Sequence, residues 1–159
     1  MSAIQVADLE EQLVVFDLGD EVYGVDISKV QEIIRMQSIT QVPGAPHFVE
    51  GVINLRGKII PVIDLHVRFG LPSAATSNSS RIVVVETDGH VIGMVVDAVS
   101  EVLRISSSCI EPPSPIVAGI DSEYIRGIAK LEGRLVILLQ LDKVLTSEQK
   151  AALQSADIS

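Results

Sequence analysis

The sequence predicts a mainly β protein made of two related lobes, because of its apolar composition and an internal repeat. Hydrophobic residues make up 47% of the 159 residues, but aromatic residues only 3%, with no Trp. The core must therefore consist of Val, Ile and Leu, and the β-branched members of this group favour strands over helices. At this length we expect one domain, or one closely joined pair of lobes.

The repeat has two blocks in the same order in each half. Residues 13–35 align without a gap on residues 82–104, and residues 48–69 align on residues 124–145. The spacer between the blocks differs, and its longer, second version carries a Pro-rich stretch at 111–119. A lobe of about 65 residues is marginal alone, so we expect the lobes to share a continuous core. The groove between them is a natural place for a binding site.

Each first block is expected to form strand, tight turn, strand and short helix. Gly19-Asp20 and Asp88-Gly89 have the composition of tight hairpin turns. Ser28 and Asp97 occupy equivalent positions and are candidate N-caps of the short helices. The apolar residues that follow recur at helical spacing. They are Val30, Ile33 and Ile34 in the first copy, and Val99, Val102 and Leu103 in the second.

Each second block is expected to form a hairpin and a short closing helix. The hairpins turn at 55–58 and 131–134, where a glycine supplies positive φ. Asp64 and Asp142 are candidate caps, and the second helix is expected to extend through 146–154.

Together these elements predict a five-stranded barrel per copy. The first barrel is expected mainly within 13–72 and the second mainly within 81–146. The Ser-rich stretch 73–80 is the expected linker between them, and residues 151–159 are the expected C-terminal tail.

Charge and cysteine content exclude several classes of function. The net charge of -9 is spread evenly over both halves, without the basic patch that nucleic acid binding requires. Cys109 is the single cysteine, which points to a reducing compartment. The first residues are acidic, unlike a signal peptide, and no apolar run approaches about 20 residues. We therefore expect a cytoplasmic protein that does not insert into the membrane.

The sequence offers no recognisable catalytic or metal-binding motif. It lacks both G-x-S-x-G and H-E-x-x-H. His47, His66 and His90 are far apart and are interpreted as surface residues, and Cys109 has no activating neighbour. We therefore expect a protein that is not an enzyme and needs neither cofactor nor metal.

Comparison of the two copies separates scaffold from recognition surface. Residues kept in both, such as Gly51 and Gly127, are interpreted as scaffold. Asn54 and Arg56 at the first hairpin tip become Lys130 and Glu132 in the second, so the tips are free to serve partners. Arg56 suits a bidentate contact with a carboxylate, although a solvated turn charge is an equal alternative.

The helix expected after Ser28 carries one further surface pair. Glu32 and Arg35 recur as Glu101 and Arg104, which predicts an i, i+3 pair of small energetic weight in each copy. Val30, Ile33 and Ile34 are interpreted as core more readily than as interface.

Residues 22–35 (VYGVDISKVQEIIR) and 42–65 (VPGAPHFVEGVINLRGKIIPVIDL) resemble the CheW family of bacterial chemotaxis coupling proteins. The resemblance runs from 13 to 145 and implies a CheW-like domain over 10–150. It implies a fold of two intertwined five-stranded SH3-like β-barrels with short helices. It also implies a non-catalytic adaptor that links methyl-accepting chemotaxis receptors to the regulatory domain of the CheA histidine kinase, in the cytoplasm at membrane receptor arrays.

The resemblance also implies positions for the partner contacts. Val30 and Glu32 in VQEI, and Arg56 in NLRG beside Asn54, match positions that the family uses for receptor or kinase contact, with Gly51 supporting the site backbone. Val99 and Glu132 are the corresponding positions in the second barrel. The Pro-rich stretch 111–119 departs from the family pattern. The alternatives are a coupling protein of a related chemosensory system, such as one for twitching motility, and a small β-barrel ligand-binding module.

Overall fold

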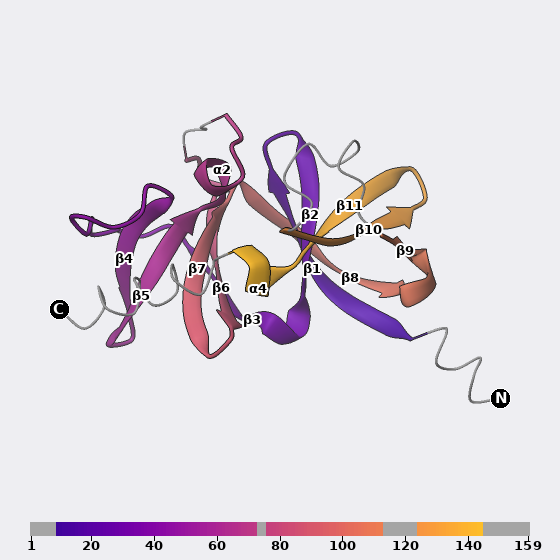
Figure 1. Ribbon diagram of the computed structural model, residues 1–159, viewed down its shortest axis with the longest axis horizontal. Helices are drawn as coiled ribbons and strands as arrows, with labels where there is room; N and C mark the ends of the chain where they lie inside the picture. The colour runs from indigo at the N-terminus through magenta and orange to yellow at the C-terminus, as the bar shows by residue number, and fades with distance from the viewer. Residues whose placement is uncertain (1–8, 73–75, 113–123, 145–159) are drawn as a thin grey trace.

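The computed structural model describes residues 9–72, 76–112 and 124–144, whose strands form two barrels side by side (Figure 1). We call them barrel I and barrel II. Barrel I consists of β3 (Val30–Arg35), β4 (Val49–Leu55), β5 (Lys58–Asp64), β6 (Arg81–Thr87) and β7 (His90–Val96), in the order β3-β6-β7-β5-β4. Barrel II consists of β1 (Glu10–Leu18), β2 (Glu21–Asp26), β8 (Ala98–Ser106), β9 (Ile110–Glu111), β10 (Ile125–Leu131) and β11 (Arg134–Leu139), in the order β8-β1-β2-β11-β10-β9.

Four helices of three or four residues complete the described structure. They are the 3-10 helices η1 (Ile27–Lys29) and η2 (Ser107–Cys109), and the α-helices α2 (Leu65–Arg68) and α4 (Leu141–Val144). The predicted mainly β fold with two SH3-like barrels and short helices is confirmed. None of the helices in the described ranges has the length and apolar character needed to cross a membrane.

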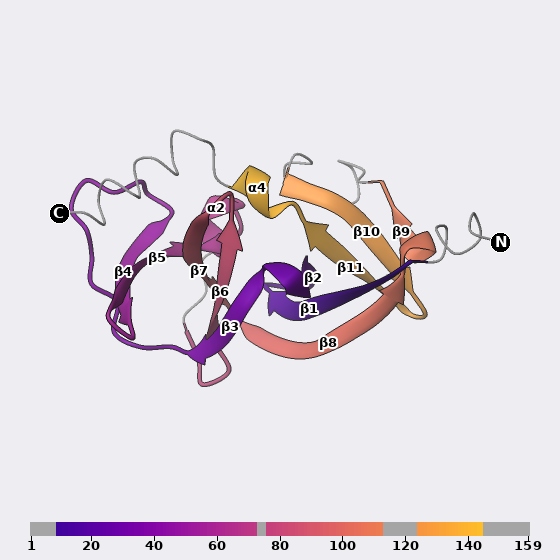
Figure 2. The ribbon, with the colours of Figure 1, turned by 90° about the horizontal axis from the view of Figure 1, so that it is seen from below.

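Each barrel contains strands from both copies of the repeat. β1 and β2 of the first copy join barrel II, where β1 pairs with β8 and β2 pairs with β11 (Figure 2). β6 and β7 of the second copy join barrel I, where β6 pairs with β3 and β7 pairs with β5. Barrel I is therefore continuous in sequence over 30–96, and barrel II is assembled from the segments on either side of it.

Because of this exchange, the two copies of the repeat do not coincide with the two barrels. The ranges 13–72 and 81–146 delimit the two copies in the sequence, but neither range forms a barrel by itself. The core of the expected linker, 73–75, lies outside the described residues, as do the tail 151–159, the helix extension 146–154, and the Pro-rich stretch beyond 112.

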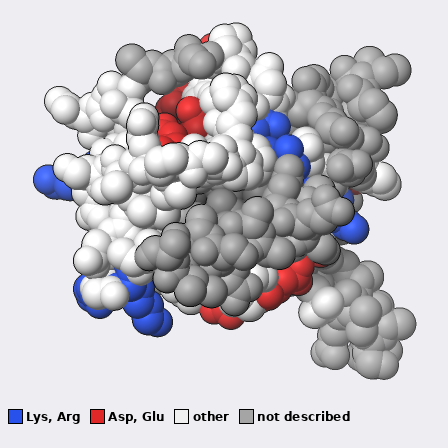
Figure 3. Space-filling view, turned by 60° about the vertical axis from the view of Figure 1, so that its left-hand side comes forward, with Lys and Arg blue, Asp and Glu red and all other residues white. Residues whose placement is uncertain are grey.

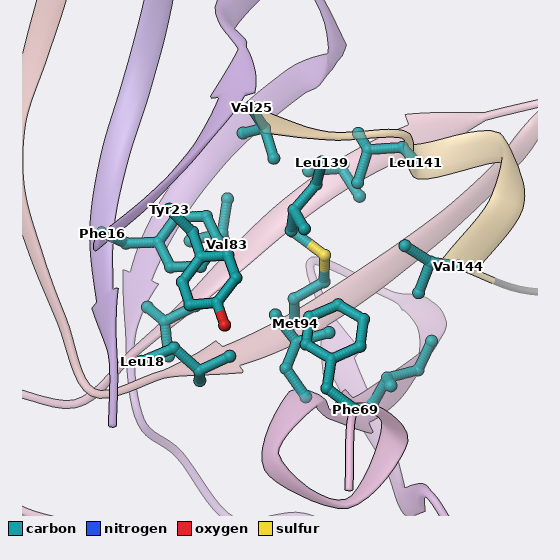
Figure 4. Packing of buried hydrophobic residues seen from close by; sticks show 14 of the residues in the cluster. Phe16, Leu18, Tyr23, Val25, Phe69, Val83, Met94, Leu139, Leu141 and Val144 are labelled. Carbon is teal, nitrogen blue, oxygen red and sulfur yellow. The ribbon is translucent and has the colours of Figure 1, made fainter. Parts of the chain in front are cut away.

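The two barrels share one core, as predicted. Alternate residues of β1 face opposite ways: Val14 and Phe16 enter the shared core, whereas Leu13 and Val15 enter the core of barrel II. Figure 4 shows Phe16 and Tyr23 of barrel II in one cluster with Met94 of barrel I. A strand buried on both faces needs an unbroken apolar run, which explains the Val-rich stretches in both copies.

The helices predicted after Ser28 and Asp97 are wrong. Only η1 forms in the first copy, and its cap is the carboxylate of Asp26, which accepts a hydrogen bond from the Ser28 backbone N–H. Residues 30–35 form β3 with alternating burial, and residues 98–106 form β8. A short apolar run fits both periods, and β-branched residues with available neighbouring strands favour the extended form.

The turn and cap predictions have mixed outcomes. Hairpin turns form at Gly19-Asp20 and Asp88-Gly89 as predicted. Asp64 caps α2 as predicted, since its carboxylate accepts the His66 N–H at 2.9 Å. Asp142, however, lies within the first turn of α4, because this helix begins at Leu141.

Candidate functional site

The tip of the β4–β5 hairpin holds Arg56 in an unusual backbone conformation. Arg56 has φ 52 and Gly57 has φ 85, so a side-chain-bearing residue occupies the left-handed region next to glycine. The side-chain oxygen of Asn54 accepts the Gly57 N–H at 2.9 Å and fastens the turn. Asn54 therefore has a structural task at the tip in addition to any contact with a partner.

The Arg56 guanidinium forms a two-pronged ion pair with Glu32 of β3. Nη1 donates to Oε1 at 3.1 Å, and Nη2 donates to Oε2. The hydrogen bond and charge of Glu32 raise the pKa of Arg56 above its usual value. The Arg56 side chain is nevertheless 70% exposed, whereas Glu32 is 26% exposed. The hairpin tip is thus held against β3 with a pre-oriented cation at the surface.

The predicted pairing of Glu32 with Arg35 is wrong. Residues three apart on a strand point to opposite faces, so the helical i, i+3 geometry does not exist on β3. The equivalent prediction for Glu101 and Arg104 fails for the same reason on β8.

Barrel II contains a repeat-related ion pair that the sequence comparison missed. Glu101 of β8 accepts a hydrogen bond from Arg134 Nη2 at 2.9 Å. Arg134 aligns with Lys58, so the basic residue lies on the opposite side of the turn from Arg56. The positive charge shared by Lys58 and Arg134 is the sequence feature from which this ion pair could have been predicted. Glu132 itself is exposed and bonds to no residue in the described ranges.

Four of the large exposed apolar side chains in the described ranges also form repeat-related pairs. Ile33 of β3 and Val102 of β8 are 39% and 53% exposed, and Ile59 of β5 and Leu135 of β11 are 45% and 48% exposed. The alignment relates the members of each pair by position. Exposed apolar residues therefore recur at the same positions on the surfaces of both barrels. The interpretation of Ile33 as a core residue is wrong.

The remaining predicted site residues lie apart from the hairpin tip. Val30 and Val99 are half-buried and pack against the shared core. Gly51 lies on β4, where an added Cβ would collide with the backbone of Thr40. The structure therefore brings Glu32, Asn54 and Arg56 together, whereas Val99 and Glu132 belong to the other barrel.

Gly51 and Gly127 allow another segment to cross closely over the hairpin in each barrel. Each lies at a register shift of its hairpin, where another segment crosses closely. Thr40 bridges to Val52 beside Gly51, and Glu111 pairs with Ile128 beside Gly127. This geometry supports the interpretation of both glycines as scaffold.

His66 is buried, contrary to its interpretation as a surface residue. It is 5% exposed, and its Nε2 lies 3.0 Å from Oδ1 of Asp97, the residue between β7 and β8. Asp97 Oδ2 also accepts the Gly19 N–H at 2.7 Å. This cluster ties α2, the β1–β2 turn and the crossover between the barrels. Across the described residues, no three His, Cys, Asp or Glu side chains gather to hold a metal ion.

Two hollows described between the barrels differ in size. One, of about 100 Å³, is lined by Thr87 of β6, by Arg126 of β10 and by residues near Leu141. The other, of about 350 Å³, lies between the β1–β2 turn and α2 and is at the lower end of the range for a small-molecule site. Figure 3 shows acidic and basic side chains in small separate groups on the face that it presents. Contacts of this face with a partner therefore depend on individual charged side chains more than on one extended patch of positive or negative charge.

Fold and surface together define a duplicated SH3-like barrel module with interaction features repeated on both barrels. The family model described as "CheW-like domain" matches residues 12–149. The chain therefore belongs to the CheW-like domain family, and it is a chemotaxis scaffold protein of that family.

Curated relatives and a solved structure agree with this assignment. "Chemotaxis protein CheW" of Klebsiella aerogenes is 38% identical over 141 residues, covering 89% of this chain and 85% of the relative. The protein of the same name from Treponema pallidum is 35% identical over 148 residues, covering 91% and 87%. The crystal structure of scaffolding protein TtCheW from Thermoanaerobacter tengcongensis is 46% identical, with a TM-score of 0.82, covering 89% of this chain and 92% of that one.

Proposed function

We propose that this chain is a non-catalytic adaptor that couples methyl-accepting chemotaxis receptors to a CheA-type histidine kinase. The observation that carries the proposal is the repeated surface. Each barrel has a Glu–Arg ion pair beside its hairpin turn, and each has two exposed apolar side chains at positions that the repeat relates. A module with two such faces can contact two partners, or one partner twice.

The shared core supports an adaptor role mechanically. Because buried residues of both barrels form one cluster, the two faces are held at a fixed spacing. Arginine is enriched at protein interfaces, and the exposed apolar side chains add area that a partner can bury. An ion pair that orients Arg56 before binding lowers the entropy lost on association.

We assign the partner contacts as follows. Val30, Glu32, Asn54 and Arg56 are the contact positions of barrel I, with Gly51 supporting the site backbone. Val99 and Glu132 are the corresponding positions on barrel II. The adaptor acts in the cytoplasm and is recruited to membrane receptor arrays through these contacts.

A three-component kinase assay tests this function. Kinase autophosphorylation is measured with a receptor cytoplasmic fragment, with and without this chain. We expect receptor control of the kinase only when the chain is present. Failure of the chain to bind either partner at tens of micromolar would show that the proposed coupling is wrong.

The assignment of Arg56 needs its own variant and control. We expect Arg56→Glu to keep the fold, measured by circular dichroism, and to lose partner binding or kinase activation, because the new carboxylate repels Glu32. Lys58→Glu is the control, because it makes the same change of charge two residues away. Lys58 forms no ion pair with any of the described residues. We expect Lys58→Glu to couple normally. If the Arg56→Glu variant couples receptor and kinase normally, Arg56 is only a residue of the turn and does not contact a partner.

A further inference from the structure

Arg35 and Arg81 lie directly opposite each other on β3 and β6. The antiparallel register pairs them at the end of the two strands. Directly opposed residues have Cβ atoms about 5 Å apart on the same face, and like charges there are destabilising. No carboxylate of the described residues forms an ion pair with either arginine, although the chain has 21 acidic and 12 basic residues.

Barrel II provides an internal reference for this position. The repeat relates Arg35 to Arg104 and Arg81 to Gln12, and these two residues also face each other, across β8 and β1. Barrel II therefore has the same geometry with one arginine and one neutral amide. The fold does not need two arginines here, so the additional charge in barrel I requires another explanation.

The two arginines line a hollow of about 400 Å³ with hydroxyl-bearing residues of the turn before β6. Arg81 Nη1 donates to the backbone carbonyls of Asn78 and Ser80, both at 2.8 Å, which fixes this guanidinium at the wall. Its Nε and Nη2 donate to none of the described residues. Ser80 is 4% exposed, and its oxygen accepts the Ser77 N–H at 2.9 Å. The hollow thus contains oriented N–H donors, and no carboxylate of the described residues accepts hydrogen bonds from them.

We propose that this hollow binds a phosphate dianion, either inorganic phosphate or the phosphate group of a small monoester. Two guanidinium groups match the two negative charges and can each donate two parallel hydrogen bonds to phosphate oxygens. The bound anion also removes the repulsion between the arginines, so binding and stability are linked. This site is separate from the hairpin tip and does not depend on the coupling function.

Calorimetric titration of the full chain with inorganic phosphate tests the proposal, with acetate and chloride at equal ionic strength as controls. We expect saturable binding of phosphate and much weaker binding of the singly charged anions. Glycerol phosphate forms the other arm: binding tighter than inorganic phosphate identifies an ester as the ligand, and weaker binding identifies free phosphate. Absence of saturable phosphate binding, or equal binding of acetate, overturns the proposal.

Arg35→Gln is the decisive variant, because the Arg35 side chain hydrogen-bonds to none of the described residues and its loss leaves the turn intact. We expect at least about tenfold weaker phosphate binding, as removal of a charged hydrogen-bonding partner predicts. Without phosphate, the variant should melt at an equal or higher temperature than the parent. Arg104→Gln is the matched control and should bind phosphate like the parent. Equal binding by Arg35→Gln and the parent, or equal loss in both variants, refutes the site.

Discussion

Replacement of Gly51 by alanine tests how the 36–47 segment is joined to the β4–β5 hairpin. An added Cβ would lie 2.8 Å from the Thr40 carbonyl carbon and closer still to its oxygen. The backbones must separate, which removes the hydrogen bonds Thr40 N to Val52 O at 2.9 Å and Val52 N to Thr40 O at 2.8 Å. At about 1 kcal/mol for each bond and about 1 kcal/mol for the unfavourable φ, we expect a loss of about 3 kcal/mol.

Equilibrium unfolding in guanidinium, followed by circular dichroism, measures this loss. Gly44→Ala is the control, because Gly44 has φ 80 and no heavy atom within 4 Å of an added Cβ. We expect Gly44→Ala to lose only about 1 kcal/mol, from φ strain alone. Gly127→Ala should also lose stability, since its Cβ would lie 2.8 Å from Glu111 O, but without the part that comes from φ. If Gly51→Ala is no less stable than Gly44→Ala, the close crossing does not hold the segment.

Three further predictions concern buried and paired groups. The Tyr23 hydroxyl is buried without a partner among the described residues, so Tyr23→Phe should stabilise the fold by about 1 kcal/mol in urea unfolding at neutral pH. Burial raises the pKa of Tyr23 to about 12, so the folded state keeps a proton that the unfolded state releases near pH 10. The parent should therefore lose stability between pH 10 and 12 more steeply than the Phe variant, and equal slopes would contradict this. Asp97→Ala should cost about 2 kcal/mol or more, because His66 and the Gly19 N–H lose their acceptor. A melting temperature unchanged from the parent would argue against that cluster. Arg134→Ala should cost less than about 1 kcal/mol, since its ion pair is exposed, and a larger loss in unfolding would show an additional contact.

Local features of the fold were predictable from the sequence because their causes are local. The turns at Gly19-Asp20 and Asp88-Gly89, and the Asp64 cap, follow from backbone preferences within a few residues. The β class and the shared core follow from composition and from the length of one repeat.

The errors arose where the outcome depends on distant residues. The run from Val30 to Arg35 suits helix and strand alike, and the neighbouring β6 decides in favour of the strand. The partner of Glu32 is Arg56 because the hairpin folds back to β3, which spacing alone does not reveal. The exchange of strands between copies leaves no local pattern, since equivalent strands of the two copies carry the same apolar sequence pattern.

The continuity of barrel I over 30–96 sets an order for folding during synthesis. All strands of barrel I have been made when residue 96 is added, whereas the β1–β2 hairpin must wait for β8 and β11 before it can join its sheet. Contacts between distant segments form slowly because long loops must close first. In pulsed hydrogen exchange during refolding, we expect amides of β3 to β7 to gain protection before those of β1 and β2, and the reverse order would contradict this sequence of events. The first hairpin of the chain to be made is thus among the last to join its sheet.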